Sequence, residues 1–536
     1  MPCPCSVRPD LTGRDGAGQP SGGECGAGTH LRPAGLKAVG GQTQTCIDNA
    51  SSWDAERCTE YTSIGIALAC RARRAVWRPP AWPLPPLRGL PIARWPRARA
   101  GRVSAPLSAH SRPFADREEP LVPKPLSAPT IALIKATVPA LETHGLAITR
   151  RMYERMFQDE AIRDLFNQSH HGETGTQPKA LAGAVLAYAR NIDNLGALGG
   201  AVERIAQKHV ALNILPEHYP VVAEALLGAI KDVLGDAASD AILAAWAEAY
   251  WFLAELLIGR EAAIYRALAS SPGGWNGWRD FRIESVQEES ATIRSFVLVP
   301  TDGGPVLRHK PGQYLGFALD LPGIGKLRRN YSISSAPNDR AYRITVKREA
   351  ATGVPPGQAS NWLHDHGAPG TVLPVAAPAG DFFLDLEDPG PVVLASGGVG
   401  LTPLVSMLET LAEAAPRHPV LWVHGTRNGG THAMGSHIRA LGARMPNLRT
   451  HVFYTAPRAE DRTGQDHDAT GRIGPSWLAA QAPPNAVFYL CGPKPFLRAM
   501  VNGLMREGVA ADRIRYEFFG PADVLLDERG EAQLAA

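Results

Sequence analysis

A histidine lies on an apolar stripe around the stretch RIAQKHVALNI, residues 204–214. At helical spacing, one face collects Val202, Ile205, Ala206, His209 and Val210. An imidazole on such a face either makes its hydrogen bonds within a protein core or ligates a metal or haem iron. A lone histidine on an apolar face is more often a core residue, so this stretch by itself leaves both interpretations open.

Three other side chains bear on the choice for His209. Tyr219 and Glu261 lie in helical segments that could reach the same pocket, and Tyr153 sits near Phe157 on an apolar face. A carboxylate hydrogen-bonded to the imidazole would make it a stronger electron donor to iron. The alternatives are ordinary, because Tyr219 precedes a proline and suits a turn, and Glu261 follows an arginine and suits a charged surface.

Two later motifs combine groups that could bind a flavin. RRNYS contains Arg329, Tyr331 and Ser332, which could pair with a pyrophosphate, stack on a flavin ring and hydrogen-bond its edge. PPGQASNWL places Ser360 at the start of a helix after a Gly-rich turn, where free backbone N–H groups suit a phosphate. A simple helix cap at Ser360 is the alternative.

A glycine-rich turn between a strand and a helix indicates a dinucleotide site. SGGVGLTP (396–403) has this context, and its glycines let backbone N–H groups approach a phosphate. The motif is not GxGxxG, so a structural turn is the alternative. YLCGPKPF ends a later strand and YEFFGP follows a last one, where the aromatic pair suits either a cover for a flavin face or a core.

The sequence pattern of the elements that must position these groups changes twice along the chain. Residues 130–269 have helical periodicity almost throughout, and the glycines of SPGGWNGW (271–278) break it, as a domain joint would. ATIRSFVLVP, GQYLGFAL, RNYSISSAP and AYRITVKRE predict an antiparallel barrel of short strands. From residue 391 strands and helices alternate, which predicts a parallel sheet with a nucleotide site at the carboxyl ends of its strands.

Composition limits the class of protein. A net charge of +3 over 536 residues gives no basic footprint for nucleic acid. No apolar run of membrane-spanning length is evident, so we expect no membrane span. Six of the seven cysteines precede residue 71, and a body that keeps only Cys491 is typical of a reducing compartment, so we expect a cytoplasmic protein.

The first 125 residues differ from the rest of the chain. Residues 71–112 are dominated by arginine and proline and contain no acid and no lysine. Proline at this density blocks helices and central strands. We expect a disordered extension or a misassigned start here, with a basic interaction tail or a targeting segment as the alternative.

In their order and spacing, the later motifs resemble those of the flavohaemoglobin family. The resemblance covers about residues 126–526. It rests on QKH with a tyrosine ten residues after its histidine, and on GREAAIY, GGWNGWRDFRI, PGQYLG, RRNYS, VKRE, SNWLH, APAGDFF, GGVGLTP, YLCGP and FFGP. It implies a multidomain chain: an all-α globin at 126–270, an antiparallel β-barrel FAD domain of ferredoxin-reductase type at 271–388, and an α/β parallel-sheet NAD(P)-binding domain at 389–526. Residues 527–536 would form a tail.

The resemblance assigns haem roles to single residues. His209 would be the proximal ligand of the haem b iron, hydrogen-bonded in a set with Tyr219 and Glu261. Tyr153 would be the distal tyrosine that steadies bound dioxygen. The expected distal lining is Phe166, Gln177 and Leu181, and the residues expected to assist electron transfer between flavin and haem are Lys208 and Glu517.

It also assigns the residues that bind the other two cofactors. The expected FAD-binding residues are Tyr314, Arg329, Asn330, Tyr331, Ser332, Gln358, Ser360, Phe518, Phe519, Gly520 and Pro521. The expected NAD(P)H-binding residues are Gly398, Val399, Gly400, Leu401, Thr402, Pro403, Cys491, Gly492 and Pro493.

The activity that the resemblance implies is that of a nitric oxide dioxygenase. Electrons would pass from NAD(P)H through FAD to haem iron, and nitric oxide and dioxygen would become nitrate, which detoxifies nitric oxide. The partners would be these small molecules, and we expect a monomer. Two alternatives stay open: an NAD(P)H-dependent reductase of hydroperoxides or other acceptors, and a haem module that binds or senses oxygen or nitric oxide. The intact RRNYS and YLCGP motifs argue against a sensor, which needs no full electron path.

Overall fold

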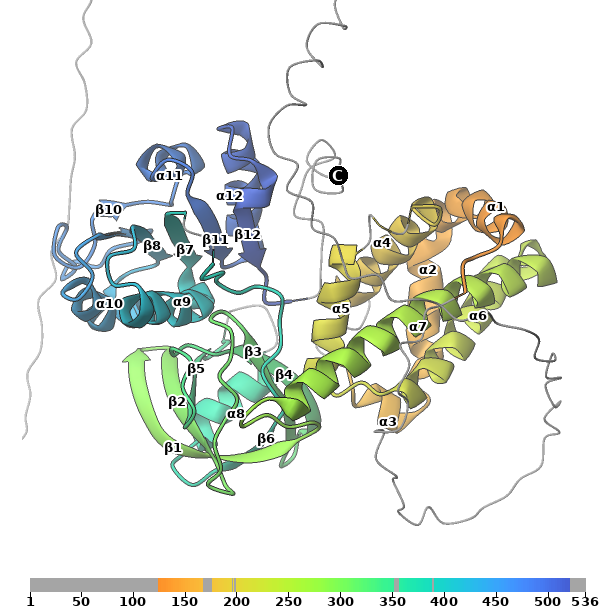
Figure 1. Ribbon diagram of the computed structural model, residues 1–536, viewed down its shortest axis with the longest axis horizontal. Helices are drawn as coiled ribbons and strands as arrows, with labels where there is room; N and C mark the ends of the chain where they lie inside the picture. Colours follow the sequence, from red (N-terminus) through yellow and green to blue (C-terminus); the bar gives the residue numbers. More distant parts are fainter. Residues whose placement is uncertain are drawn as a thin grey trace, which may run out of the picture. The chain divides into compact units, whose positions relative to one another are not determined.

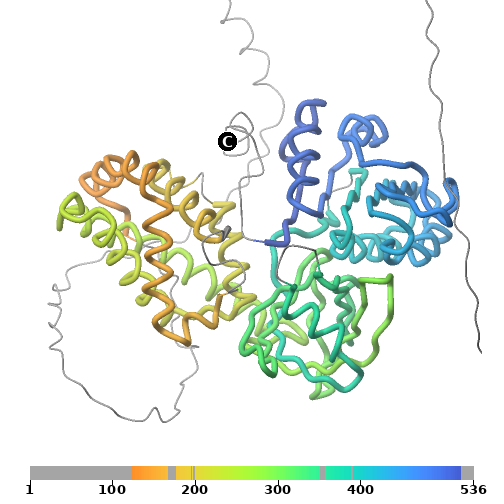
Figure 2. Tube along the Cα trace, turned by 180° about the vertical axis from the view of Figure 1, so that it is seen from behind, coloured from red at the N-terminus to blue at the C-terminus, as the bar shows by residue number. Residues whose placement is uncertain are grey.

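The computed structural model describes residues 124–166, 176–194, 196, 199–350, 356–387 and 390–520 (Figure 1). Apart from residues 124 and 125, the expected N-terminal extension lies outside these residues, as do Pro521 and the tail. Along the described chain, helices come first, an antiparallel sheet follows, and a parallel sheet with flanking helices comes last (Figure 1). Figure 2 shows by its colours the same order along the Cα trace, from the N-terminal to the C-terminal part. The fold classes expected for the three parts are confirmed.

The helical part begins with two helices where the sequence pattern suggests one amphipathic run. The side chain of Ser127 caps the first helix by accepting the N–H of Thr130. The run then bends by 68° at Thr137, because Pro139 has no N–H to donate to a helix that continues through this point. The helices are α1 (Ala128–Ala136), α2 (Val138–Met156), α3 (Glu160–Arg163), α4 (Thr176–Arg190), α5 (Gly199–Ala211), α6 (Tyr219–Leu234) and α7 (Asp240–Ser270), with short turns η3 (Pro216–His218) and η4 (Gly235–Ala237).

The apolar core of the helical part falls into two clusters. The first joins α1, α2, α4, α6 and the first half of α7, and it contains Tyr153. The second joins α5, α6 and the second half of α7, and it contains Tyr219. Ile214, Tyr250 and Leu253 pack against both clusters. The tyrosines expected on the two sides of a haem therefore belong to adjoining clusters of one helical core.

Helix α7 corrects one expectation from the sequence. By length and apolar composition it could cross a membrane, and the bent pair α1 and α2 passes the same test when taken together. Helix α7 contacts α1, α5 and α6 and buries Trp246 and the carboxylate of Glu261 among them. These contacts give its apolar side chains partners within the helical part, and 28% of its membrane-length window is buried.

The antiparallel sheet closes on itself. Its strands are β1 (Arg279–Ser290), β2 (Ile293–Pro300), β3 (Tyr314–Leu321), β4 (Gly325–Ser332), β5 (Tyr342–Lys347) and β6 (Val372–Val375), in the order β4-β3-β6-β1-β2-β5. Just beyond the outer strand β4, Ile333 bridges Ile344 of β5, and the N–H of Ser334 donates to the Arg343 oxygen at 2.7 Å. These bonds join the two outer strands into a barrel, and helix α8 (Gln358–His366) contacts strand β3.

The parallel sheet reverses its strand order at β7. Its strands are β7 (Val392–Gly397), β8 (Val420–Thr426), β9 (Leu448–Tyr454), β10 (Ala469–Thr470), β11 (Val487–Cys491) and β12 (Ile514–Glu517), in the order β10-β9-β8-β7-β11-β12. The helices around it are α9 (Leu401–Ala414), α10 (Gly435–Gly442), α11 (Pro475–Gln481) and α12 (Lys494–Arg506), with turns η5 (Gly398–Gly400), η6 (Gly429–Thr431) and η7 (Ala511–Arg513). Alternate residues of β7 pack toward α9 and α10 on one face and toward α11 and α12 on the other. The crevice expected at such a reversal lies between the carboxyl ends of β7 and β11.

Candidate functional site

His209, Tyr219 and Glu261 meet in the second helical cluster. Nδ1 of His209 lies 2.7 Å from Oε1 of Glu261 and 3.1 Å from the hydroxyl of Tyr219. The Tyr219 hydroxyl also donates to the same Glu261 oxygen at 2.6 Å. An Nδ1–H donor satisfies this arrangement, so the tautomer of the imidazole is set by the carboxylate.

Burial excludes the ordinary alternatives for the two partners of His209. Glu261 is 2% exposed, whereas its neighbour Arg260 points outward and pairs with Glu203. Tyr219 is 6% exposed and begins α6 with a proline in the first turn, so it is a core residue and no surface turn. Burial, and then the charge of Glu261, raise the pKa of Tyr219 well above its usual range.

The remaining nitrogen of His209 suits an iron ligand. Nε2 has no hydrogen-bond partner among the residues that the structure describes, and the side chain remains 31% exposed. A core histidine would use both nitrogens, while a haem ligand uses one for the metal and the other for an orienting partner. The donor set therefore fits haem ligation by His209.

Tyr153 occupies the first helical cluster among aromatic side chains. Its ring lies 5.5 Å from that of Phe157 and 5.6 Å from that of Phe166, centroid to centroid, and Leu181 packs against the same cluster. Burial raises the pKa of Tyr153 strongly, and a hydrogen bond with Gln177 opposes part of that rise. The structure thus brings together all four residues expected on the distal side.

Lys208 and Glu517 are close enough to interact electrostatically. Glu517 ends β12, and burial raises the pKa of its carboxyl group to about 7, although the charge of Lys208 favours the ionised form. The carboxylate of Asp381 raises this pKa further and Arg204 lowers it. Lys208 comes from helix α5, so charged groups of the helical part and of the parallel sheet face each other at this point.

The residues of RRNYS lie on strand β4, paired with β3. Tyr314 pairs with Ser332 and Asn330 with Gly316 in the antiparallel register. Burial lowers the pKa of Arg329, and among described residues no carboxylate forms an ion pair with this guanidinium. A cation that is partly buried without an acid fits an anionic pyrophosphate.

Helix α8 corrects the alternative considered for Ser360. Gly357 is the cap residue of α8, and Gln358 is the first residue of the helix. Ser360 is buried inside the first turn, and its hydroxyl donates to the Gly357 oxygen at 3.3 Å and accepts the N–H of Glu349 at 3.4 Å. Since Gly357 makes no side-chain cap, the first N–H groups of α8 suit a phosphate.

The Gly-rich turn after β7 lies directly against the end of β11. A Cβ on Gly400 would be only 2.2 Å from the backbone oxygen of Cys491, and Gly398 has a φ of +55°. In the register of the sheet, Cys491 lies beside both Ser396 and Glu517. Residues 398–403 and 491–493 therefore meet at the reversal of strand order, where a dinucleotide is expected.

The aromatic residues after β12 divide between core and surface. Phe518 packs against the cluster under α11 and α12, whereas Phe519 is 46% exposed. Gly520 follows against the ring of Phe518. An exposed aromatic side chain at this place is available to cover a flat ligand.

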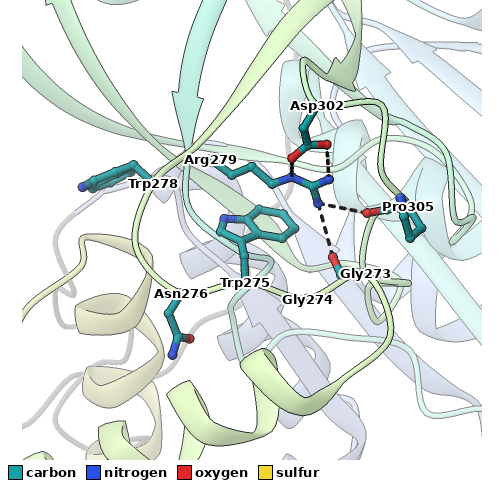
Figure 3. A pocket seen from close by; sticks show the side chains of 8 residues that line it. All are labelled: Gly273, Gly274, Trp275, Asn276, Trp278, Arg279, Asp302 and Pro305. Carbon is teal, nitrogen blue, oxygen red and sulfur yellow. Dashed lines mark hydrogen bonds and ion pairs between the residues drawn. The ribbon is translucent and has the colours of Figure 1, made fainter. Parts of the chain in front are cut away.

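A pocket of about 470 Å³ lies at the segment that joins the helices to the barrel (Figure 3). Arg279 lines this pocket, and its guanidinium donates to both carboxylate oxygens of Asp302 and to the backbone oxygens of Pro305 and Gly273. Figure 3 shows Trp275 beside this network. None of the residues expected to bind a cofactor lines this pocket, so we interpret it as part of a structural joint.

Contacts between α5 and the barrel were not expected from the sequence. The N–H of Gly380 donates to Oε1 of Gln207 at 3.0 Å, and Arg204 lies 3.5 Å from Asp381. These partners are far apart along the chain, and helical periodicity gives no sign of them. Gln207 is one of several polar residues on this amphipathic helix, so its residue type did not single it out.

The comparisons with known proteins cover both ends of the described chain. A globin family model matches residues 150–255, and a model of the oxidoreductase NAD-binding domain matches residues 394–502. The chain is 54% identical over 395 residues to a flavohemoprotein of Xylella fastidiosa, covering 74% of this chain and 97% of that protein. It is 48% identical over 399 residues to a flavohemoprotein of Chromobacterium violaceum, covering 74% and 98%.

A solved structure agrees with these sequence relatives. The flavohemoglobin of Malassezia yamatoensis, crystallised with bound FAD and heme, superposes with a TM-score of 0.64 at 27% identity and covers 74% of this chain and 100% of its own. The sequence relatives and the solved structure belong to the same class of protein, and the two family models match a globin part and an oxidoreductase NAD-binding part of this chain. The chain belongs to the flavohaemoprotein family.

Proposed function

We propose that this flavohaem oxidoreductase is a nitric oxide dioxygenase that uses haem b, FAD and NAD(P)H. The observation that carries the proposal is the His209–Glu261 bond of 2.7 Å beside a buried tyrosine, Tyr219, in a helical core that also buries the Tyr153 hydroxyl. The Malassezia yamatoensis relative binds FAD and heme, which supports the same two cofactors here. When bound, these groups carry electrons from NAD(P)H to dioxygen.

On the proximal side, we assign the orienting role to Glu261. Its carboxylate accepts a hydrogen bond from Nδ1–H of His209, which gives the imidazole partial anionic character and makes Nε2 a stronger electron donor to iron. Tyr219 holds the same carboxylate oxygen and thereby fixes its direction. The buried position keeps water from competing for either bond.

On the distal side, we assign the donor role to the hydroxyl of Tyr153. Its raised pKa keeps this phenol protonated at every physiological pH, so it can donate to a partly anionic oxygen. Such a bond is worth about 1–3 kcal/mol. Gln177 is its hydrogen-bond partner in the described structure and would hold the phenol in place. Phe166 and Leu181 would supply the apolar part of the lining around the Tyr153 hydroxyl.

In the reductase part, we assign the cofactors to the surfaces described above. FAD would be bound by Tyr314 of β3, residues 329–332 of β4, the start of α8 and the segment 518–520, and Arg329 would neutralise the pyrophosphate. The turn 398–403 and residues 491–493 would bind the nicotinamide dinucleotide. Lys208 and Glu517 would assist electron transfer by setting the local charge between the flavin and the haem.

We also propose the domain limits 126–270, 271–388 and 389–526, a monomeric state and a cytoplasmic location. The last helix of the helical part, α7, ends at Ser270, and β1 begins at Arg279, which supports the first limit. The substrates would be dioxygen, nitric oxide and NAD(P)H.

Competition between acceptors tests the proposed activity. The protein, loaded with haem and FAD, is given NADH with nitric oxide, an alkyl hydroperoxide or ferricyanide, each with and without oxygen. We expect nitric oxide in the presence of oxygen to be consumed fastest. If a hydroperoxide is turned over faster at equal concentration, the chain is a reductase of that acceptor instead.

A further inference from the structure

The outward face of strand β3 receives the end of helix α5. Leu315 and Phe317 point into the barrel core, so Tyr314 and Gly316 point outward, because strand residues alternate between faces. Tyr314 belongs to the same apolar cluster as Ala211, the last residue of α5. The proximal cluster of the helical part therefore continues onto the barrel through this strand.

Gly316 is the point of closest approach. A Cβ at this position would lie 1.8 Å from the backbone oxygen of Ala211 and 2.8 Å from its carbonyl carbon. Gly316 is absent from the glycines with positive φ, so its backbone conformation does not demand glycine. The residue is small because another backbone occupies the place of a side chain.

This approach lies between the residues expected to serve the two redox centres. Ala211 follows His209 by two residues on the same helix. In the strand pair, Gly316 lies opposite Asn330, which stands between Arg329 and Tyr331. The path from the proximal histidine to the flavin strand therefore crosses a contact between two backbones.

Polar contacts hold the helix beside this glycine. Gly380 donates its N–H to Oε1 of Gln207 at 3.0 Å, and Nε2 of Gln207 donates to Glu203 at 2.8 Å. Glu203 is in turn paired with Arg260 of α7. The amide of Gln207 is thus fixed at both ends, which lets it hold α5 at one distance from the barrel.

We propose that Gly316 is a positioning residue that sets how closely helix α5 approaches the flavin strands β3 and β4, and thereby how fast electrons reach the haem. This inference rests on the proposed function. A methyl group at residue 316 cannot be accommodated by a rotamer change, because the atoms that it would meet are backbone. Helix α5 must move outward, and the contact with Gly380 must lengthen with it.

The test compares Gly316→Ala with Gly442→Ala in the full chain loaded with haem and FAD. The control adds the same methyl group in helix α10, where nothing lies nearer than 3.9 Å. Stopped-flow absorbance under carbon monoxide separates reduction of the flavin by NADH from reduction of the haem by the flavin. Hydrogen–deuterium exchange measures the amide of Gly380 independently of any activity.

We expect Gly316→Ala to keep FAD and the rate of flavin reduction, to slow haem reduction several-fold, and to exchange the Gly380 amide faster. The control should match the wild type in all three. Unchanged haem reduction with unchanged exchange at Gly380 would overturn the inference. A defect confined to FAD binding would assign Gly316 to flavin binding and also overturn it.

Two further outcomes remain decisive. If Gly316→Ala does not fold, Gln207→Leu removes the acceptor of the Gly380 N–H without adding volume against the barrel. Faster exchange at Gly380 with unchanged haem reduction in that variant would contradict the inference. If NADH fails to reduce the haem of the wild type, the proposed function fails, and exchange at Gly380 alone decides whether Gly316 positions α5.

Discussion

At the scale of single residues, burial separates functional groups from neighbours of the same type. Glu261 and Arg260 are adjacent, yet the carboxylate lies in the core against His209 and the guanidinium pairs with Glu203 at the surface. The sequence alone could not decide whether Glu261 is a buried partner of His209 or a charged surface residue. Three helices had to be packed before the partner of His209 could be identified, and helical periodicity does not fix which faces meet.

The proximal set predicts a change in the haem when its carboxylate is neutralised. Glu261→Gln should raise the haem reduction potential. A neutral amide accepts a weaker hydrogen bond from Nδ1–H, so the imidazole loses its anionic character and donates less electron density to the iron. Turnover should fall about 10- to 100-fold, as for other partners of metal ligands. A redox titration followed in the Soret band measures the first effect. Arg260→Gln is the control, and an equal potential in both variants would show that Glu261 does not act through His209.

The distal tyrosine predicts a faster loss of dioxygen when its hydroxyl is removed. Tyr153→Phe should lose about 1–3 kcal/mol of dioxygen-binding free energy, because the donated hydrogen bond disappears while the ring remains. The dioxygen dissociation rate, measured by displacement with carbon monoxide, reports this loss. Tyr188→Phe removes another buried hydroxyl, which donates to the Ala249 oxygen, and should leave the rate unchanged. A similar change in both variants would point to a general effect on packing.

At the scale of elements, the Gly-rich turn owes its shape to the strand beside it. The strand–turn–helix context of 396–403 could be predicted, and so could the apolar alternation of β2 and β3. The closeness of Gly400 to Cys491 could not, because it depends on β11 returning beside β7 after almost a hundred residues. Pro139 in the sequence could have predicted the break between α1 and α2. Nothing in the sequence could have predicted the contact at Gly316.

The turn predicts a double effect of one methyl group. Gly400→Ala should lower the free energy of unfolding by about 1–3 kcal/mol, because the added Cβ overlaps backbone atoms of β11. The KM for NADH should rise in the same variant, since the turn that faces the dinucleotide must shift. Urea unfolding and steady-state kinetics measure the two effects. If the variant is destabilised with an unchanged KM, the turn is structural and does not bind the dinucleotide.

At the scale of the whole described chain, a buried histidine links the barrel to the parallel sheet. Nε2 of His309 lies 3.1 Å from the Ser335 oxygen and 3.2 Å from Oγ of Ser406 on helix α9. Burial lowers the pKa of His309 to about 4. The folded protein therefore keeps this imidazole neutral, while the unfolded chain takes up a proton at the ordinary pKa of 6.5.

This linkage predicts a loss of stability in mild acid. The contribution of His309 is fully present above pH 6.5 and is lost as the pH falls toward 4, because protons then favour the unfolded chain. Between pH 7 and pH 5 the loss should be about 2 kcal/mol. His309→Gln can still donate to Ser335 but cannot be protonated, so its unfolding free energy in urea should fall less over this range. An equal fall in both proteins would show that His309 titrates normally.

The complete electron path from NADH to haem should convert nitric oxide and dioxygen to nitrate. The most direct measurement is the conversion of nitric oxide to nitrate by the protein loaded with haem and FAD, in the presence of oxygen, with NADH added last. We predict that consumption of nitric oxide begins with NADH, yields an equimolar amount of nitrate, and disappears in His209→Ala while NADH still reduces the flavin. Flavin reduction by NADH without nitrate formation in the wild type would contradict the account.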